Sequence, residues 1–123
     1  MKICISSTGS SMDSTLDPRF GRAVYFIIAD TETMEYESIE NTAALSGGGA
    51  GVTSGQLMAD KGVSAVITGS VGPNAMNVLK AAEIDVYRGL PTTVKENIAK
   101  FKEGSLEKID SPGPSHSGMG GQR

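Results

Sequence analysis

The residues of this sequence best suited to binding chemistry are three of its arginines, Arg19, Arg22 and Arg88. A guanidinium group is always charged and offers several N–H donors, so it recognises carboxylates and other anions. Arg19 and Arg22 also lie close to Asp17 in the sequence. They therefore have two interpretations: they pair with Asp17 and hold the loop around Phe20, or they bind an anionic ligand. The sequence supports both.

The single cysteine and the single histidine limit metal chemistry. Cys4 lies between two isoleucines, a setting typical of a buried core residue rather than a reactive thiol. His116 lies among serines, prolines and glycines and is either a solvated side chain or the one candidate metal ligand. Since no Ser-His-Asp or Cys-His set can be assembled around a histidine in such a segment, we expect a protein without catalytic activity.

A cluster of glycines at 47–55 offers backbone that a ligand can approach closely. The cluster is not a dinucleotide-binding fingerprint, because Ser54 stands where the last glycine is required and no acidic residue follows about 20 residues later. The sequence also has no Gly-Lys-Ser/Thr phosphate loop. The stretch is therefore either a flexible connection or a set of N–H donors for an anion.

Composition excludes several classes of protein. The net charge is −3 and no run of Lys or Arg occurs, which disfavours a nucleic-acid binder. One cysteine allows no internal disulfide, so we expect a cytoplasmic protein. No apolar stretch approaches the roughly 20 residues of a membrane helix, and residues 1–5 do not resemble a signal peptide. We expect one α/β domain over residues 1–109 and a disordered tail rich in Pro, Gly and Ser over 110–123.

The positions of the candidate residues depend on a pattern of alternating strands and helices. Apolar runs predict strands at 3–5, 23–29, 63–68 and 84–87, and the mixed polarity of 34–40 predicts a half-exposed outer strand. Helical spacing predicts helices at 53–61, 73–82 and 93–104. The second of these has an inward stripe of Met76, Leu79 and Ala82, and Asn74 near its start is either a cap or a ligand contact. The third begins with a capping box of Thr93 and Glu96.

Topology predicts where these residues meet. If the first two helices are right-handed crossovers, strands 34–40, 63–68 and 84–87 are parallel, strand 3–5 lies beside 63–68, and strand 23–29 is antiparallel. Loops 7–22, 42–53, 69–73 and 88–92 then gather at one edge of the sheet, together with the N-termini of all three helices. Helix N-termini and arginines favour an anion, so the sequence predicts an anion-binding cleft at this edge.

Four segments resemble a known family. They are DPRFGRA at 17–23, GAGVTSGQLMADKGV at 49–63, VITGSVGPNA at 66–75 and KAAEIDVY at 80–87. Together they are similar to the dinitrogenase iron–molybdenum cofactor biosynthesis family, over residues 1–108. The resemblance implies a ribonuclease H-like α/β fold: a five-stranded mixed sheet with the second strand antiparallel and helices on both faces.

The resemblance also implies a function. Family members are accessory or carrier proteins for anionic iron–sulfur-type or iron–molybdenum-type clusters or their precursors, and their partners are metallocofactor assembly or acceptor proteins. Many relatives have Cys- or His-rich segments near the C-terminus, whereas this chain has His116 alone. A monomer or weak oligomer is expected. The expected cofactor-binding residues are Arg19, Arg22, Gly49, Gly51, Thr53, Gly72, Asn74 and Arg88, with His116 as the metal ligand.

A metal-dependent nuclease is disfavoured, since it needs paired carboxylates and the first strand has Cys4 and Ser6 but no acid. The alternative that stands is a small-anion sensor or a protein-interaction module that keeps the fold without a cofactor.

Overall fold

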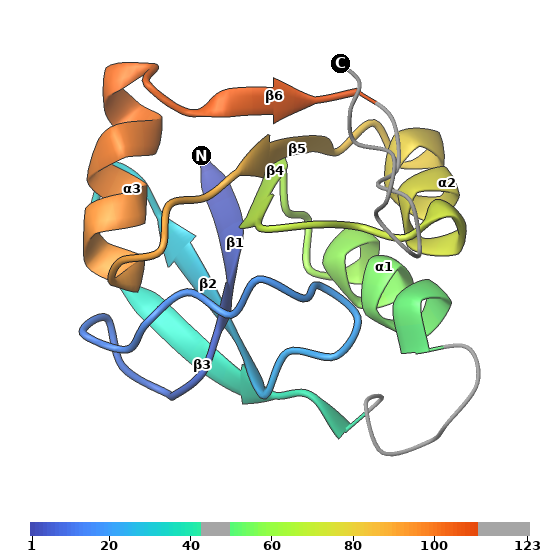
Figure 1. Cartoon of the computed structure of the whole chain (residues 1–123), viewed down its shortest axis with the longest axis horizontal. Helices are drawn as coiled ribbons and strands as arrows, with labels where there is room; N and C mark the ends of the chain where they lie inside the picture. Colours follow the sequence, from blue (N-terminus) through green and yellow to red (C-terminus); the bar gives the residue numbers. More distant parts are fainter. Residues whose placement is uncertain (43–49, 111–123) are drawn as a thin grey trace.

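One mixed β-sheet forms the centre of the protein (Figure 1). The computed structural model describes residues 1–42 and 50–110, and within these ranges the sheet has six strands in the order β3-β2-β1-β4-β5-β6. The strands are β1 (Lys2–Ser7), β2 (Tyr25–Asp30), β3 (Tyr36–Glu40), β4 (Ala65–Thr68), β5 (Asp85–Arg88) and β6 (Glu107–Ile109).

The strand directions confirm the predicted topology. β1 is parallel to β4, and β4 is parallel to β5. β2 is antiparallel to both of its neighbours, β1 and β3, so β3 runs in the same direction as β1, β4 and β5. The carboxyl ends of β1, β3, β4 and β5 therefore lie at one edge of the sheet, where loops can build a binding site.

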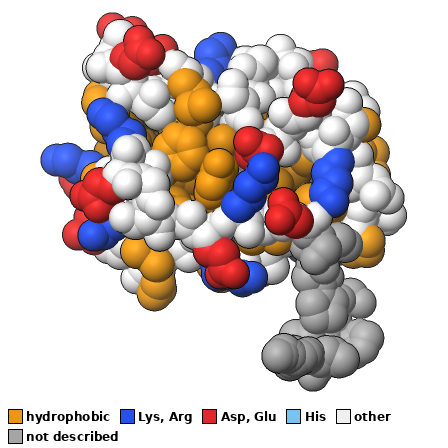
Figure 2. All heavy atoms as spheres, turned by 90° about the horizontal axis from the view of Figure 1, so that it is seen from above, with side chains coloured by type: hydrophobic (Ala, Val, Ile, Leu, Met, Phe, Trp, Pro, Cys, Tyr) orange, Lys and Arg blue, Asp and Glu red, His pale blue; other side chains and the backbone are white. Residues whose placement is uncertain are grey.

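The prediction of five strands is wrong, because β6 adds a sixth, antiparallel to β5. This edge strand has three residues and no hydrophobic alternation, so no pattern in the sequence marks it. Ion pairs to β5 support it: Arg88 with Glu107 at 3.3 Å and Lys108 with Asp85 at 3.2 Å. Figure 2 views the molecule from this side, where Lys and Arg side chains lie next to Asp and Glu side chains. Charges of this kind keep an exposed edge strand from pairing with other chains.

Helices cover both faces of the sheet, as predicted. α1 (Ala50–Asp60) and α2 (Pro73–Ala81) lie on one face, and α3 (Val94–Glu103) lies on the other (Figure 1). The alternation in β1 separates the two cores: Cys4 packs with the α1 and α2 side chains, whereas Ile3 and Ile5 pack with the α3 side chains. The predicted ribonuclease H-like topology stays a prediction. In the described ranges no helix is long and apolar enough to cross a membrane.

The helix ends differ slightly from the predictions. Gly62 and Gly104 adopt left-handed backbone conformations with φ of 73° and 77°, the usual conformation of a glycine just past the end of a helix, here α1 and α3. α1 begins at Ala50, three residues before the predicted start. Ala82 is exposed at the C-cap of α2 and is not part of the inward stripe, which consists of Ala75, Met76 and Leu79.

Candidate anion-binding cleft

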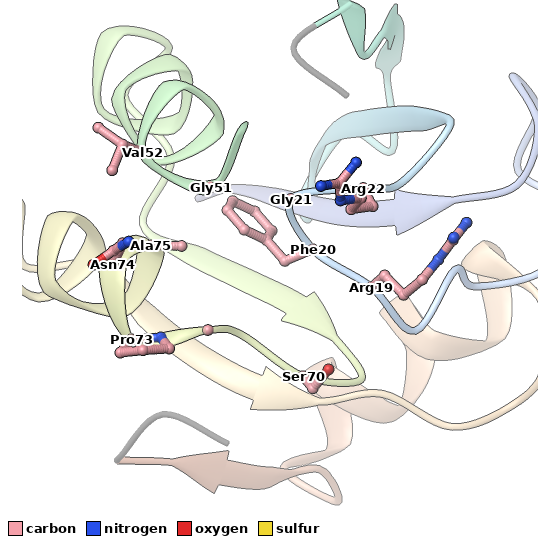
Figure 3. Close-up of a pocket in the computed structure, with 11 residues that line it drawn as sticks. Arg19, Phe20, Gly21, Arg22, Gly51, Val52, Ser70, Pro73, Asn74 and Ala75 are labelled. Carbon is pink, nitrogen blue, oxygen red and sulfur yellow. The ribbon is translucent and has the colours of Figure 1, made fainter. Parts of the chain in front are cut away.

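A cleft of about 310 Å³ lies between the segment at 19–22, the first turn of α1 and the segment that leads from β4 into α2 (Figure 3). All three segments lie toward the carboxyl ends of the parallel strands. The lining residues are Arg19, Phe20, Gly21, Arg22, Gly51, Val52, Ser70, Gly72, Pro73, Asn74 and Ala75.

One wall of the cleft is a seam between two segments that are far apart in the sequence. The N–H of Ser70 donates to the carbonyl oxygen of Pro18 at 2.8 Å, and the N–H of Phe20 donates to the carbonyl oxygen of Ser70 at 3.3 Å. Gly69 permits this approach, since a Cβ atom there would lie 2.6 Å from the Pro18 oxygen. Any larger residue at position 69 would therefore push the two segments apart.

The other side of the cleft depends on small residues between α1 and α2. A Cβ atom at Gly51 would lie 3.1 Å from the Cβ of Ala75, and one at Gly55 would lie 2.8 Å from Val78 Cγ1. The close packing brings the first turns of both helices to the same cleft. Phe20 points toward Gly51 and Ala75 (Figure 3) at the base of the cleft and, with 1% of its surface exposed, is packed almost wholly into the core.

The N-terminus of α2 is open. Gly72 is the N-cap and has no side chain to accept a hydrogen bond, and Pro73 has no N–H. Among the described residues, no oxygen accepts from the N–H groups of Asn74 and Ala75, which both line the cleft. Of the two interpretations of Asn74, the cap is wrong, because the N-cap is Gly72, two residues earlier. Unpaired N–H groups at a helix start provide donors and partial positive charge for an anion.

The two arginines of the cleft differ in their partners. Arg19 donates from Nε to Asp17 Oδ1 and from Nη2 to Asp17 Oδ2, both at 3.1 Å, and these hydrogen bonds raise the pKa of Arg19. Its side chain extends away from α1 and α2 in Figure 3. Arg22 has no carboxylate within 4.0 Å among the described residues. Arg19 is therefore the arginine that pairs with Asp17. Arg22 is the candidate for binding an anionic ligand.

The prediction that all three helix N-termini serve this cleft is wrong for α3. The N–H of Val94 donates to the Ser14 carbonyl at 2.8 Å, and that of Lys95 donates to the Met12 carbonyl at 2.9 Å. The N–H of Glu96 donates to Thr93 Oγ1, which confirms one half of the capping box. The other half of the capping box, a bond from the Thr93 backbone N–H to the Glu96 carboxylate, is not formed. The Glu96 carboxylate accepts from the Thr92 hydroxyl instead. The start of α3 is thus occupied by the protein itself.

The remaining predicted site residues fall into two groups. Thr53 is exposed on α1 and does not line the cleft. Arg88 does not line it either, because its Nε donates to Glu107 at 3.3 Å and its Nη1 donates to the Gly69 carbonyl at 3.4 Å. Gly49 and His116 lie outside the described residues, as does the predicted tail beyond Asp110. Arg19, Arg22, Gly51, Gly72 and Asn74 are the predicted residues that the structure brings together.

Sequence reasoning missed the apolar and hydroxyl parts of the cleft. Phe20, Val52 and Ser70 line the cleft and are not among the expected cofactor-binding residues. The signal for Ser70 was its place between Gly69 and the Gly-Pro start of α2, since a short loop after a buried strand is exposed at the ligand edge.

Direct metal ligation has no support in the described part of the chain, which contains no group of three or more His, Cys, Asp or Glu side chains suited to a metal ion. Cys4 is buried, and burial raises the pKa of its thiol, as expected for an inert core residue. The residues of the cleft fit a ligand held as an anion by N–H donors rather than by metal–ligand bonds.

The chain resembles proteins of known sequence and structure over almost its full length. An uncharacterised protein from Methanocaldococcus jannaschii is 43% identical over 101 residues, covering 80% of this chain and 86% of the relative. The apo form of the orange protein from Desulfovibrio gigas has a TM-score of 0.88 at 34% identity, covering 92% of this chain and 96% of that chain. A Thermotoga protein assigned provisionally as NifB, of the DUF35 family, has a TM-score of 0.82 at 41% identity, covering 93% and 97%.

A provisional dinitrogenase from Methanocaldococcus jannaschii shares the fold at 23% identity, with a TM-score of 0.69 and coverage of 91% and 97%. Residues 1–104 match the family described as dinitrogenase iron-molybdenum cofactor. This match confirms the resemblance drawn from the four sequence segments, and the chain belongs to the dinitrogenase iron-molybdenum cofactor family.

Proposed function

We propose that this protein is a non-catalytic carrier that binds an anionic iron–sulfur-type or iron–molybdenum-type cofactor, or a precursor of one, in the cleft. The observation that carries the proposal is that Arg22 lines the same cleft as the N–H groups of Asn74 and Ala75, which donate to no acceptor among the described residues. Charge-assisted hydrogen bonds from such donors hold an anion without a bond to its metal. Membership of the family supports the choice of a metal–sulfur anion over others.

The composition of the cleft supports the same choice. Val52 and Pro73, which are both exposed, give one part of the cleft an apolar surface, while Arg22 and Ser70 give another part donors. A small, strongly hydrated anion gains little from apolar neighbours, because it must first lose water. A metal–sulfur cluster has polarizable sulfide ligands and a delocalised negative charge. Its sulfides can contact the apolar part of the cleft while its charge is stabilised by the donors of the other part. The expected partners are the assembly or acceptor proteins that load and unload the cluster.

A small-anion sensor is the second candidate, because Arg22 and an open helix start also suit a simple oxyanion. The two functions differ in how much the apolar part of the cleft contributes to the affinity for the ligand. We therefore compare a synthetic [4Fe–4S] thiolate cluster with sodium sulfate in two-dimensional NMR titrations under anaerobic conditions. A carrier binds the cluster more tightly, with shifts at 19–22, 51–52 and 70–75. A sensor binds sulfate at least as well as the cluster.

Two arginine variants locate the ligand. Arg22→Ala should weaken cluster binding by roughly tenfold to a hundredfold, on the order of 1–3 kcal/mol for a charge-assisted hydrogen bond. Arg88→Ala removes the same charge outside the cleft and should leave the affinity nearly unchanged. Binding should also weaken with salt, since charges are screened over about 10 Å at 0.1 M. Shifts confined to the opposite edge of the sheet, or equal effects of the two variants, would contradict the proposal.

A further inference from the structure

Asn41, the residue that directly follows β3, is almost fully buried, with 7% of its surface exposed. Its side-chain Nδ2 donates to two carbonyl oxygens, those of Gly21 at 3.1 Å and Ala23 at 2.8 Å. Its backbone N–H donates to the Val24 carbonyl at 3.0 Å. Three hydrogen bonds from one residue thus hold the segment at 21–24, which contains Arg22.

The segment at 20–23 has little support of its own. It is a turn whose backbone hydrogen bond, from the N–H of Ala23 to the Phe20 carbonyl, is 3.4 Å long. The two carbonyls held by the Asn41 amide lie on either side of Arg22 in the chain. The orientation of the Arg22 peptide, and with it the direction in which the side chain leaves the backbone, therefore depends on Asn41.

We propose that Asn41 is the positioning residue of the cleft: its side-chain amide holds the carbonyls before and after Arg22, and so fixes where the Arg22 guanidinium meets a bound anion. The inference rests on the proposed function for its effect on binding, while its effect on the turn can be measured without a ligand. A primary amide is suited to the role because its NH₂ group has two donors, one for each carbonyl. Aspartate has nearly the same shape and, when ionised, no donor at all.

A second asparagine provides a matched control. Asn97 in α3 is fully buried, and its Nδ2 donates to the carbonyls of Leu90 at 3.1 Å and Thr93 at 2.9 Å. Its Oδ1 accepts from the N–H of Leu90 at 2.7 Å. Asn97 is thus also an amide that holds a loop by three hydrogen bonds, but neither Leu90 nor Thr93 lines the cleft.

The first experiment needs no variant and no ligand. NMR on the wild-type protein should detect scalar couplings across the hydrogen bonds from Asn41 Nδ2 to the carbonyl carbons of Gly21 and Ala23. The Asn41 side-chain amide protons should also exchange slowly with solvent. Absence of both signals would overturn the inference even if the variants below fail to fold.

The second experiment compares Asn41→Ala, Asn41→Asp and Asn97→Ala. We expect both Asn41 variants to lower the backbone order parameters of Arg22 and Ala23, and to weaken binding of the [4Fe–4S] thiolate probe about as much as Arg22→Ala does. The double variant Asn41→Ala/Arg22→Ala should lose little more, since both changes remove one interaction. Asn97→Ala should lower the unfolding midpoint and leave the probe affinity within about twofold.

The outcomes separate this inference from the proposed function. If Asn41 only fills space, Asn41→Asp keeps wild-type order at Arg22 and wild-type affinity, and the inference is wrong. If additive losses appear in the double variant, Asn41 does not act through Arg22. If the wild-type protein binds no cluster, the proposed function fails, and the order parameters alone decide whether Asn41 positions the turn.

Discussion

The starts of α2 and α3 are at the same edge of one sheet, yet they are completed in different ways. At α3, the carbonyls of Ser14 and Met12 and the Thr93 hydroxyl accept from the first three N–H groups of the helix. At α2, Gly72 and Pro73 leave the N–H groups of Asn74 and Ala75 without an acceptor among the described residues. The first arrangement stabilises the helix, and the second leaves donors free for a ligand.

The difference follows from how the chain crosses the sheet edge between β1 and β2. Residues 12–16 lie on the α3 face, where Leu16 packs with Ile98. Residues 17–22 lie on the other face, where Phe20 packs with Phe26 at a ring-centroid distance of 5.3 Å. One loop therefore closes the start of one helix and forms the rim of a cleft at the start of another. A helix N-terminus indicates a ligand site only when the protein's own backbone does not occupy it.

The largest effect is expected from a carboxylate placed at the open helix start. The N-cap Gly72 has an extended backbone, with φ −72° and ψ 170°, and a Cβ there meets no atom within 4 Å, so Gly72→Asp fits and should cap α2. Binding of the [4Fe–4S] thiolate probe should fall by roughly a hundredfold or more, because two charge-assisted hydrogen bonds, each on the order of 1–3 kcal/mol, are lost. Isothermal titration calorimetry measures the affinity.

Thr93→Asp is the matched control for this change. It adds the same charge at the N-cap of α3 and keeps a side-chain acceptor there, so it should leave the probe affinity unchanged. Gly72→Asp should alter the unfolding free energy by only a few tenths of a kcal/mol, the usual difference between Gly and Asp at an N-cap. Equal loss of affinity in both variants would mean that net charge, and not the open helix start, attracts the anion.

A smaller effect, on stability instead of binding, is expected at the closed helix start. Thr93→Ala removes the oxygen that accepts from the Glu96 N–H at 3.1 Å. The unfolding free energy should fall by about 1 kcal/mol, the typical loss for an N-cap threonine. Urea unfolding gives this value, and the probe titration should match that of the wild-type protein. A loss of affinity here would show that the start of α3 takes part in binding after all.

The smallest effect concerns a carboxylate that already caps backbone N–H groups, at the turn between β2 and β3. Asp30 Oδ1 accepts from the N–H of Glu32 at 2.8 Å and of Thr33 at 3.2 Å, and these two hydrogen bonds lower the pKa of Asp30. A lowered pKa in the folded state means that the carboxylate stabilises the fold at neutral pH, and that this contribution is lost as the pH falls below about 4.

Asp30→Ala should therefore lower the urea midpoint slightly at pH 7, and the difference from wild type should shrink as the protein is acidified below pH 4. A difference that stays constant across this range would mean that side-chain packing, and not the charge, is responsible. The result also gives a reference for Gly72→Asp, because both carboxylates would accept from backbone N–H groups.

Much of this architecture could be predicted from the sequence. The apolar runs marked β1, β2, β4 and β5, and the handedness of the crossovers then determined which strands are parallel and which loops meet. β6 could not be predicted, since a three-residue charged edge strand depends on ion pairs with β5. The hydrogen bonds that complete the start of α3 could not be predicted either, because backbone carbonyls of a distant loop accept them and no residue type in the sequence indicates this.

Individual polar residues, in the candidate site and outside it, could not be interpreted from the sequence either. Asn41 and Asn97 look like ordinary surface residues in the sequence, yet both are buried because nearby backbone groups satisfy their amides. The two arginines near Asp17 were equivalent in the sequence. Only the geometry separates them, since the bidentate contact to Asp17 is made by Arg19. Local sequence patterns predict helices and strands, whereas the hydrogen-bond partner of a given side chain is known only from the three-dimensional structure.

The seam between Pro18 and Ser70 has a consequence for folding. It joins residues 52 positions apart in the chain, so the cleft is absent until β1 and β4 are paired and the intervening loops are closed. An unfolded or partly folded chain then lacks the cleft, so any ligand of the cleft would bind the native state alone. Bound ligand shifts the folding equilibrium toward the native state by RT ln(1 + [L]/Kd). A chain with bound ligand should consequently unfold less often than an empty chain. It should also be digested more slowly by proteases that act on the unfolded state.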